Sequence, residues 1–279
     1  VTNRADTPPV ATNHAEHGYA TDALVDHNTA RAKGGVGLII TEVVTVEPTY
    51  TYLPGDMCCY DDTFIPGWEK LAAAVHQYGA MIMPQLFHPA YMAFNMPGTP
   101  RLIAPSYVGP SYAREAPRPI TIDEIHELTR QFGDAAVRMQ TAGVDGVEVH
   151  AAHAHGMLGG FLSPQYNKRT DEYGGSLDAR MRFLLEVVAV IRERCGKDFI
   201  IDVRISGDEY TDGGRTLNDM IYVARRLEKA GVDMIHGSGG TTIKRGSAIP
   251  AAGTKQASHA ALSREIKKHV TIPVATVGR

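Results

Sequence analysis

The chain has 279 residues, 43% of them hydrophobic, and a formal net charge of −3 at neutral pH. That length suits one (β/α)8 barrel, and the composition can supply a large apolar core. The nearly balanced charge, without a run of basic residues, gives no support for a nucleic-acid partner or a membrane-surface role.

The three cysteines, Cys58, Cys59 and Cys195, lack a C-x-x-C spacing, so this segment alone cannot build a zinc site or an iron–sulphur cluster. Sparse, unpaired cysteines are typical of a reducing cytoplasm. The sequence also shows no signal peptide and no apolar run of 18 residues. We therefore expect a cytoplasmic protein with no membrane partner.

Short runs rich in Val, Ile and Leu alternate with longer amphipathic stretches along the chain. Continuous apolar runs are typical of parallel strands that are buried on both faces. A poorer first strand is predicted over residues 3–9. The clearer strands are predicted over residues 36–40, 81–86, 146–150, 199–204, 234–236 and 272–277.

The longer stretches carry helix start and stop signals. Thr121 and Glu124 form a capping-box pattern, and Gly143 follows the periodic segment behind them. The predicted helices span residues 67–78, 121–143, 176–194 and 216–230. Strands that alternate with helices indicate βαβ units and a parallel sheet.

Seven strands are predicted, and the last one reaches the end of the sequence. Because polar residues end most of these strands, we predict a (β/α)8 TIM barrel in one domain over residues 1–279. It is present as about seven βα units, with the eighth strand missing. An open doubly wound sheet is the structural alternative.

Residues 88–119 form a long connection with seven prolines and no periodicity. Loops of this length are usually functional lids or disordered segments. The connection follows the carboxyl end of a predicted strand, where the active sites of barrels lie.

The residues at the predicted strand ends argue against several classes of reaction. No serine or cysteine stands at a strand end beside a histidine, which argues against acyl transfer. Glu42 and Glu148 lie within strands, where they should point into the core or pair, so glycoside hydrolysis is also disfavoured. The amide, imidazole and guanidinium groups that remain suit an enzyme that positions a cofactor.

Residues 147–175 read V-E-V-H-A-A-H-A-H-G-M-L-G-G-F-L-S-P-Q-Y-N-K-R-T-D-E-Y-G-G. This segment closely resembles the signature of the Old Yellow Enzyme family of NADH:flavin oxidoreductases. The stretches R-A-K-G-G-V-G-L-I-I-T-E, Q-L-F-H and V-R-I-S-G-D-E-Y-T-D-G-G resemble the family in the same order, so the likeness covers essentially the whole chain. It is closest to the multidomain branch that holds 2,4-dienoyl-CoA reductase and the bile-acid enoate reductases.

The resemblance implies an FMN-binding barrel. NAD(P)H would reduce the flavin, which would pass hydride to the C=C bond of an α,β-unsaturated carbonyl compound or a dienoyl thioester. Arg204 would face the N1 side of the flavin and Gln85 its pyrimidine edge. Carried over by position, the flavin-binding residues are Pro9, Val10, Ala11, Val43, Gln85, His150, Arg204, Gly278 and Arg279.

His150 and His153 match the histidine pair that holds the substrate carbonyl oxygen in the family. Donors there would stabilise a developing enolate, as in an oxyanion hole. The tyrosine that serves simple family members as proton donor is absent, and His155 is the candidate acid in its place. A different donor, water, or a metal site built from the three histidines remain alternatives.

The resemblance also implies a longer protein, in which a 4Fe–4S cluster and FAD could follow the barrel. A homo-oligomer is a further expectation. Two other functions stay open: an amine dehydrogenase of the trimethylamine type, which would need an aromatic cage for an ammonium group, and a non-catalytic flavin-binding barrel. The only tryptophan, Trp68, falls in a predicted helix.

Overall fold

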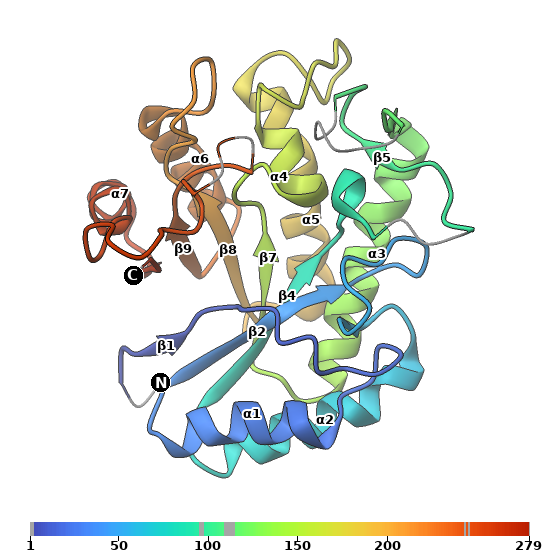
Figure 1. The fold of residues 1–279 in the computed structure, drawn as a ribbon, viewed down its shortest axis with the longest axis vertical. Helices are drawn as coiled ribbons and strands as arrows, with labels where there is room; N and C mark the ends of the chain where they lie inside the picture. The colour runs from blue at the N-terminus through green and yellow to red at the C-terminus, as the bar shows by residue number, and fades with distance from the viewer. Residues whose placement is uncertain (1–2, 95–97, 109–114, 243, 245, 279) are drawn as a thin grey trace.

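A computed structural model describes residues 3–94, 98–108, 115–242, 244 and 246–278. Its centre is a curled parallel sheet in the order β1-β2-β4-β7-β8-β9-β10, with the short β3 beside β2 (Figure 1). The strands are β1 (Asp6–Thr7), β2 (Leu38–Thr45), β3 (Met57–Cys58), β4 (Met81–Phe87), β7 (Gly146–His150), β8 (Ile200–Ser206), β9 (Met234–Ser238) and β10 (Val274–Thr276). Two more short strands, β5 (Ile103–Ala104) and β6 (Arg118–Pro119), pair with each other within the long connection.

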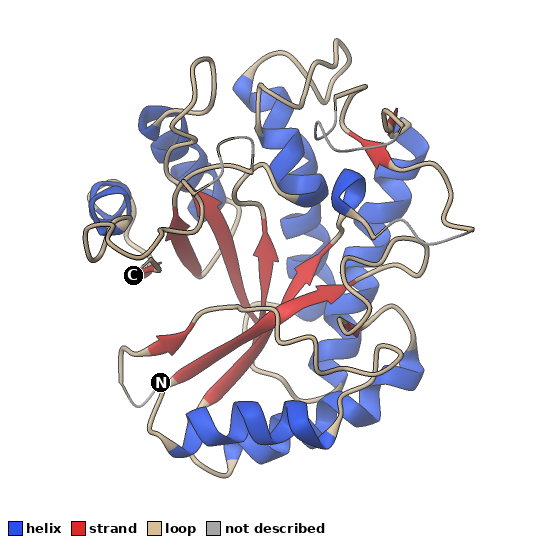
Figure 2. Ribbon diagram, viewed as in Figure 1, coloured by secondary structure: helices blue, strands red, loops and turns tan. Residues whose placement is uncertain are grey.

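Helices cover the outer side of this curled sheet (Figure 2). Consecutive helices of the outer row contact one another, from α1 and α2 through α3, α5 and α6 to α7. Their bounds are α1 (Asp22–Lys33), α2 (Ile65–His76), α3 (Ile122–Thr141), α5 (Leu177–Cys195), α6 (Leu217–Lys229) and α7 (Ala260–Lys267), while α4 (Gly156–Leu162) lies beyond the end of β7. No helix among the described ranges is long and apolar enough to cross a bilayer.

The predicted barrel architecture is confirmed as an incomplete barrel. Seven strands follow one another in the sheet path, and within the described residues β1 and β10 form its two open ends. All four predicted helices are present with ends shifted by a few residues. The capping box of Thr121 and Glu124 forms as predicted. The helices α1, α4 and α7 were not predicted, because their apolar positions are few or their segments are short.

The prediction that the strands are apolar on both faces is wrong for β7, β8 and β9. Val147, Val149, Ile201, Val203 and Ile235 point outward and join the apolar core between sheet and helices. The residues between them are polar and buried on the inner face: Glu148, His150, Asp202, His236 and Ser238. Successive side chains of a strand point to opposite faces, so the inner and outer sets separate by alternation.

The inner face is layered along the strands. Leu38, Ile40 and Met83 form a small separate apolar cluster, with Met81, Ile200 and Met234 packed against it, at the amino ends of the strands. The polar inner residues follow toward the carboxyl ends, where Gln85 is in register with Glu148 and His150 with Arg204. The polar part of the interior therefore leads directly to the end of the barrel where ligands bind in this architecture.

Candidate functional site

The carboxyl ends of the strands bring several predicted site residues together; we call this region the mouth. The ring centroid of His150 lies 6.0 Å from that of His153 and 5.6 Å from that of His155. Phe87 of β4 packs 5.1 Å from His150, and the strand register places Arg204 beside it. The three predicted catalytic histidines therefore form one cluster with an aromatic wall.

His150 is a neutral hydrogen-bond donor in this setting. The backbone N–H of Ala152 donates to its Nδ1 over 3.3 Å, so the ring proton of the neutral imidazole resides on Nε2. Burial, with the nearby His155 and Arg204 charges, holds the pKa of His150 well below its usual value. The side chain can offer an Nε2–H to an oxygen without carrying a charge.

His153 is held by two serines from neighbouring strands. Its backbone N–H donates to Ser206 Oγ over 2.7 Å, and its ring nitrogens lie 3.2 Å from Ser206 Oγ and 3.3 Å from Ser238 Oγ. Its φ of 62° is in the left-handed region, and such backbone strain concentrates at functional sites. The sequence analysis did not predict a role for either serine. Each lies two residues beyond an inward-facing side chain, Arg204 or His236, and the two-residue period of a strand could have placed both serines on the inner face.

His155 packs against aromatic rings and has no ionic partner at its Nε2. Its ring centroid lies 5.1 Å from Tyr52 and 5.2 Å from Phe87. Across the described chain, no hydrogen-bond partner is found for the buried Nε2. Burial and the charge of Arg204 lower the pKa of His155 to about 4. It is therefore neutral at pH 7, and an acid role would have to use a neutral ring N–H.

Arg204 carries an unused donor at the mouth. Burial lowers its pKa, while Glu148 and Asp202 act in the opposite direction. Its Nε is buried and finds no hydrogen-bond partner in the part of the chain that is described. A buried guanidinium with an unsatisfied N–H is costly unless a ligand completes it.

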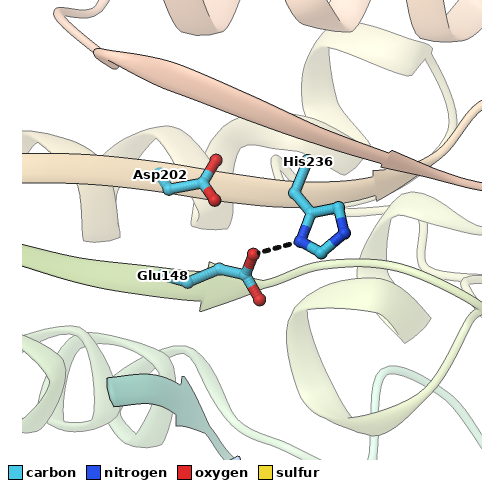
Figure 3. A group of neighbouring side chains, drawn as sticks. All are labelled: Glu148, Asp202 and His236. Atoms are coloured by element: carbon cyan, nitrogen blue, oxygen red, sulfur yellow. Dashed lines mark hydrogen bonds and ion pairs between the residues drawn. The ribbon is translucent and has the colours of Figure 1, made fainter. Parts of the chain in front are cut away.

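A second polar cluster lies one layer below the mouth (Figure 3). The Gln85 Nε2 donates to one oxygen of Glu148, and His236 Nδ1 lies 2.6 Å from the other. Asp202 of β8 approaches the same carboxylate. All four side chains are buried. The prediction that Glu148 pairs in the core is confirmed, but its partner His236 is 88 residues away and was not foreseen.

The loop after β1 brings apolar groups to the mouth. Val10 is 66% exposed, which is unusual for a valine at a barrel end, and Pro9 and Ala11 flank it. The loop is tied down by buried Glu42, which accepts hydrogen bonds from the backbone N–H groups of Thr12 and Asn13.

Val43 lies on β2 directly after Glu42. It follows a shift in the pairing of β2 with β4 between Ile40 and Val43, and its side chain is half-buried. Such irregularities redirect side chains next to functional sites.

Glycines just beyond β9 and β10 pack closely against His259. Gly278 has a φ of 126°, and a Cβ there would lie 2.9 Å from His259 Nδ1, while one at Gly239 would lie 2.8 Å from the same ring. Ser258 Oγ and His259 Nδ1 are buried, with no hydrogen-bond partner among the residues described. The predicted partner of Gly278, Arg279, lies outside the described residues.

The end of the motif, residues 167–175, is structural. Arg169 forms an ion pair with Asp171 and donates to the backbone oxygens of Pro105 and Ile120. Asn167 donates to the oxygens of Phe161 and Tyr173. These bonds tie the loop after β7 to the long connection and hold the mouth in shape.

Known proteins share both the sequence and the fold. The NADH oxidase of Thermoanaerobacter brockii is 42% identical over 283 residues, which cover 100% of this chain and 43% of the relative. The structure of 2-naphthoyl-CoA reductase in complex with 2-naphthoyl-CoA superposes with a TM-score of 0.91 at 27% identity, over 98% of this chain and 44% of that one. Histamine dehydrogenase from Rhizobium sp. 4-9 gives 0.88 at 28% identity, over 99% and 40%.

The chain thus spans less than half the length of these relatives. The family model for the NADH:flavin oxidoreductase / NADH oxidase family matches residues 1–279. With the signature of residues 147–175 and the barrel geometry, these matches establish that the chain belongs to the NADH:flavin oxidoreductase / NADH oxidase family, which is Old Yellow Enzyme-like.

Proposed function

We propose that this chain is the FMN-binding barrel of an NAD(P)H-dependent ene-reductase. The observation that carries the proposal is the mouth itself. A neutral His150 presents an Nε2–H beside a buried Arg204 whose Nε has no partner in the described chain. A donor without charge next to a fixed cation suits a site that binds a flavin and the oxygen of a carbonyl substrate.

The residues fit FMN at three points. Arg204 Nε needs an acceptor, which the N1–C2 edge of an isoalloxazine offers. Val10 exposes an apolar surface that a flat ring would cover. The proposed phosphate site lies at Gly239 and Gly278, beside the unpartnered Ser258 Oγ of the described chain. These fits support the predicted flavin-binding roles of Val10, Arg204 and Gly278. The roles of Pro9, Ala11, Val43, Gln85 and His150 stay predictions, and Arg279 lies outside the described residues.

Bound FMN would supply the hydride that NAD(P)H provides to one alkene carbon, and a proton from His155 or from water would complete the other carbon. His150 would donate from Nε2 to the substrate carbonyl oxygen and so polarise the conjugated C=C bond. Ser206 and Ser238 would fix the ring of His153 as the second donor. The aromatic groups Phe87 and Tyr52 would keep water from the reacting carbon.

The substrate class is an α,β-unsaturated carbonyl compound or a dienoyl thioester. The likeness to 2-naphthoyl-CoA reductase supports a thioester, because that reductase is solved with an aromatic CoA ester. We extend the proposal to the multidomain branch of the family. The 4Fe–4S cluster and FAD expected there would lie outside these residues, and iron and flavin analysis of the intact protein tests for them.

The likeness to histamine dehydrogenase favours a second function, oxidation of an amine. An ammonium substrate needs aromatic faces around it. Trp68, however, is fully buried in α2 and donates from Nε1 to the backbone oxygen of Cys58, so it is not available at the mouth. Phe87 and Tyr52 do line the mouth, so aromatic faces alone do not separate the two functions, and turnover of amines against enones decides between them.

The intact protein is the subject of the first experiment. We expect a flavin spectrum that NAD(P)H bleaches without air and that a simple enone restores. Exchange of His150 for Phe should slow the enone step about 10²-fold to 10³-fold, and by more than it slows bleaching by NAD(P)H, because His150 is also a predicted flavin-binding residue. A protein that neither contains nor takes up FMN would overturn the proposal, and oxidation of amines but not reduction of enones would favour the second function.

A further inference from the structure

Glu148 stands where two predicted flavin-facing side chains meet. Gln85, from β4, donates its Nε2–H to Glu148 Oε1, and the register pairs these two residues directly across the strands. On the side of Glu148 that faces β8, its register partner is Asp202. Arg204 lies two residues further along β8 and is the charged residue nearest the mouth. No solvent reaches Glu148, which is 0% exposed.

The cluster holds protons rather than a metal ion. The potential ligand atoms of Glu148, Asp202 and His236 lie within 4.8 Å of one another, which is close enough for one metal ion to bind all three. The His236 Nδ1, however, lies only 2.6 Å from Glu148 Oε2, which is a direct hydrogen bond, and Gln85 occupies the other oxygen. Both oxygens of Glu148 are therefore already in contact with nitrogens, of which Figure 3 shows that of His236.

Among the carboxyls of this cluster, Glu148 is the one held toward the charged form. Burial opposes ionisation of Glu148, but the neighbouring His236, Arg204 and Asp202 together outweigh it and lower the pKa of Glu148. Burial and the charge of Glu148 raise the pKa of Asp202 well above its usual value. Asp6 of β1 approaches from the far end of the sheet, and burial raises its pKa as well. Asp202 and Asp6 are thus shifted toward the neutral form and Glu148 toward the charged form, against His236 and below Arg204.

We propose that Glu148 is the positioning residue of the flavin site: it orients the Gln85 amide and offsets the charge of Arg204, and so sets the reduction potential of the bound flavin. The inference rests on the proposed function. Because Nε2 of Gln85 is bound to Glu148, the amide turns its oxygen away from Glu148, toward where the flavin edge is proposed to lie.

The negative charge of Glu148 should lower the reduction potential of the bound flavin. Reduced flavin carries more negative charge than oxidised flavin, so Arg204 favours reduction and Glu148 opposes it. Loss of the Glu148 charge should therefore make the flavin easier to reduce. A single Glu148→Gln exchange is ambiguous, because Asp202 could then ionise and restore the charge. The pair of variants D202N and E148Q/D202N avoids this.

The experiment measures the flavin potential and the FMN dissociation constant of the full-length protein. Because burial and the charge of Glu148 favour the neutral form of Asp202, D202N should stay close to the wild-type potential. In E148Q/D202N we expect about a tenfold higher ratio of reduced to oxidised flavin at a given potential, ~30 mV for a two-electron couple. If both variants have the same potential, Glu148 does not tune the flavin and that part of the inference is overturned.

The Glu148→Asp variant separates the effect of the hydrogen bond to Gln85 from the effect of the negative charge. It also provides a test if the double variant does not fold. The shorter side chain keeps the charge but cannot reach Gln85. We expect a wild-type potential and about tenfold weaker binding of FMN to the apoprotein, measured by flavin fluorescence. Unchanged FMN affinity would overturn the positioning role. Absence of FMN binding in the wild-type protein would instead contradict the proposed function, so the two failures are distinguishable.

Discussion

The outer and inner faces of the sheet use alternate residues of the same strands but have opposite chemistry. The outer face presents Val147, Val203 and Ile235 to the helices, and each buried aliphatic side chain contributes about 1.5–3 kcal/mol. The inner face presents Glu148 and Arg204, whose burial costs free energy unless partners or a ligand compensate it. Stability therefore comes from one face and function from the other.

A charge on the outer face should do the most damage. Ile235 is completely buried between β9 and the helices, so Ile235→Asp would bury a carboxylate without a partner. We expect a loss of at least about 4–5 kcal/mol in the free energy of unfolding, enough to leave little soluble protein. Urea denaturation followed by circular dichroism measures it.

The matched control is Ile249→Asp, at a position that is 82% exposed, which should change stability by less than about 0.5 kcal/mol. Similar losses at both positions would mean that the outer face is not the main source of stability.

A buried ion pair near the mouth tests the polar side of the comparison. Arg215 and Glu209 are both fully buried, with 2.9 Å between Nη2 and Oε1, and Ser163 Oγ also donates to Glu209. Arg215→Met leaves that carboxylate without its cation, and we expect a loss of about 3–5 kcal/mol in thermal or urea unfolding.

The double variant Arg215→Met/Glu209→Gln also removes the carboxylate that lost its partner. It should recover part of the free energy of unfolding that Arg215→Met loses. A double variant no more stable than Arg215→Met would show that packing, not charge, keeps this pair in place.

Lowering the pH should destabilise the residues of the mouth before it destabilises the packing between the sheet and the outer helices. The pKa of His155 is about 4 in the folded protein and near 6.5 when the chain is unfolded, so between these values the unfolded chain binds more protons. The free energy of unfolding should therefore fall as the pH drops from about 6.5 to 4, by up to about 3 kcal/mol. Urea midpoints across this range measure the slope.

His155→Gln removes the titrating group and should flatten that slope. An equally steep loss of stability in His155→Gln would assign the acid sensitivity to other buried groups, such as His150 and His153, whose pKa values burial also lowers.

The smallest effect is expected at a helix start in the outer layer. Thr121 Oγ1 accepts the backbone N–H of Glu124 over 3.2 Å at the start of α3. Thr121→Ala should cost about 1 kcal/mol, well below the cost of a charge at Ile235, because packing holds α3 more than its cap does. Thr121→Ser should restore most of the loss, and an equal loss in both variants would exclude the hydroxyl as its cause.

Much of the fold could be predicted from local patterns. Apolar runs located β4, β7, β8 and β9, and capping signals located α3 and α6, because both depend on neighbours in the sequence. The short helices α4 and α7 escaped prediction, since α4 is glycine-rich and α7 has only eight residues. The motif of residues 147–175 was specific enough to indicate the family by itself.

The candidate site could be predicted only where a residue acts through its place at a strand end. Gln85, His150, His153 and Arg204 were predicted in this way, and the barrel brings their strands side by side. The partners that define their chemistry were not found. Ser206 is 53 residues from His153, and no local pattern links them.

The sequence by itself therefore determined the order of strands and helices, the family and the candidates at the mouth, because periodicity and motif are local properties. Only the tertiary structure decided which face each side chain occupies and which groups share a proton. Glu148 meets Gln85 and His236 because the register of β4, β7, β8 and β9 brings together residues 63 and 88 positions apart. Burial and these partners then shift the carboxyls toward different protonation states, which no linear pattern records.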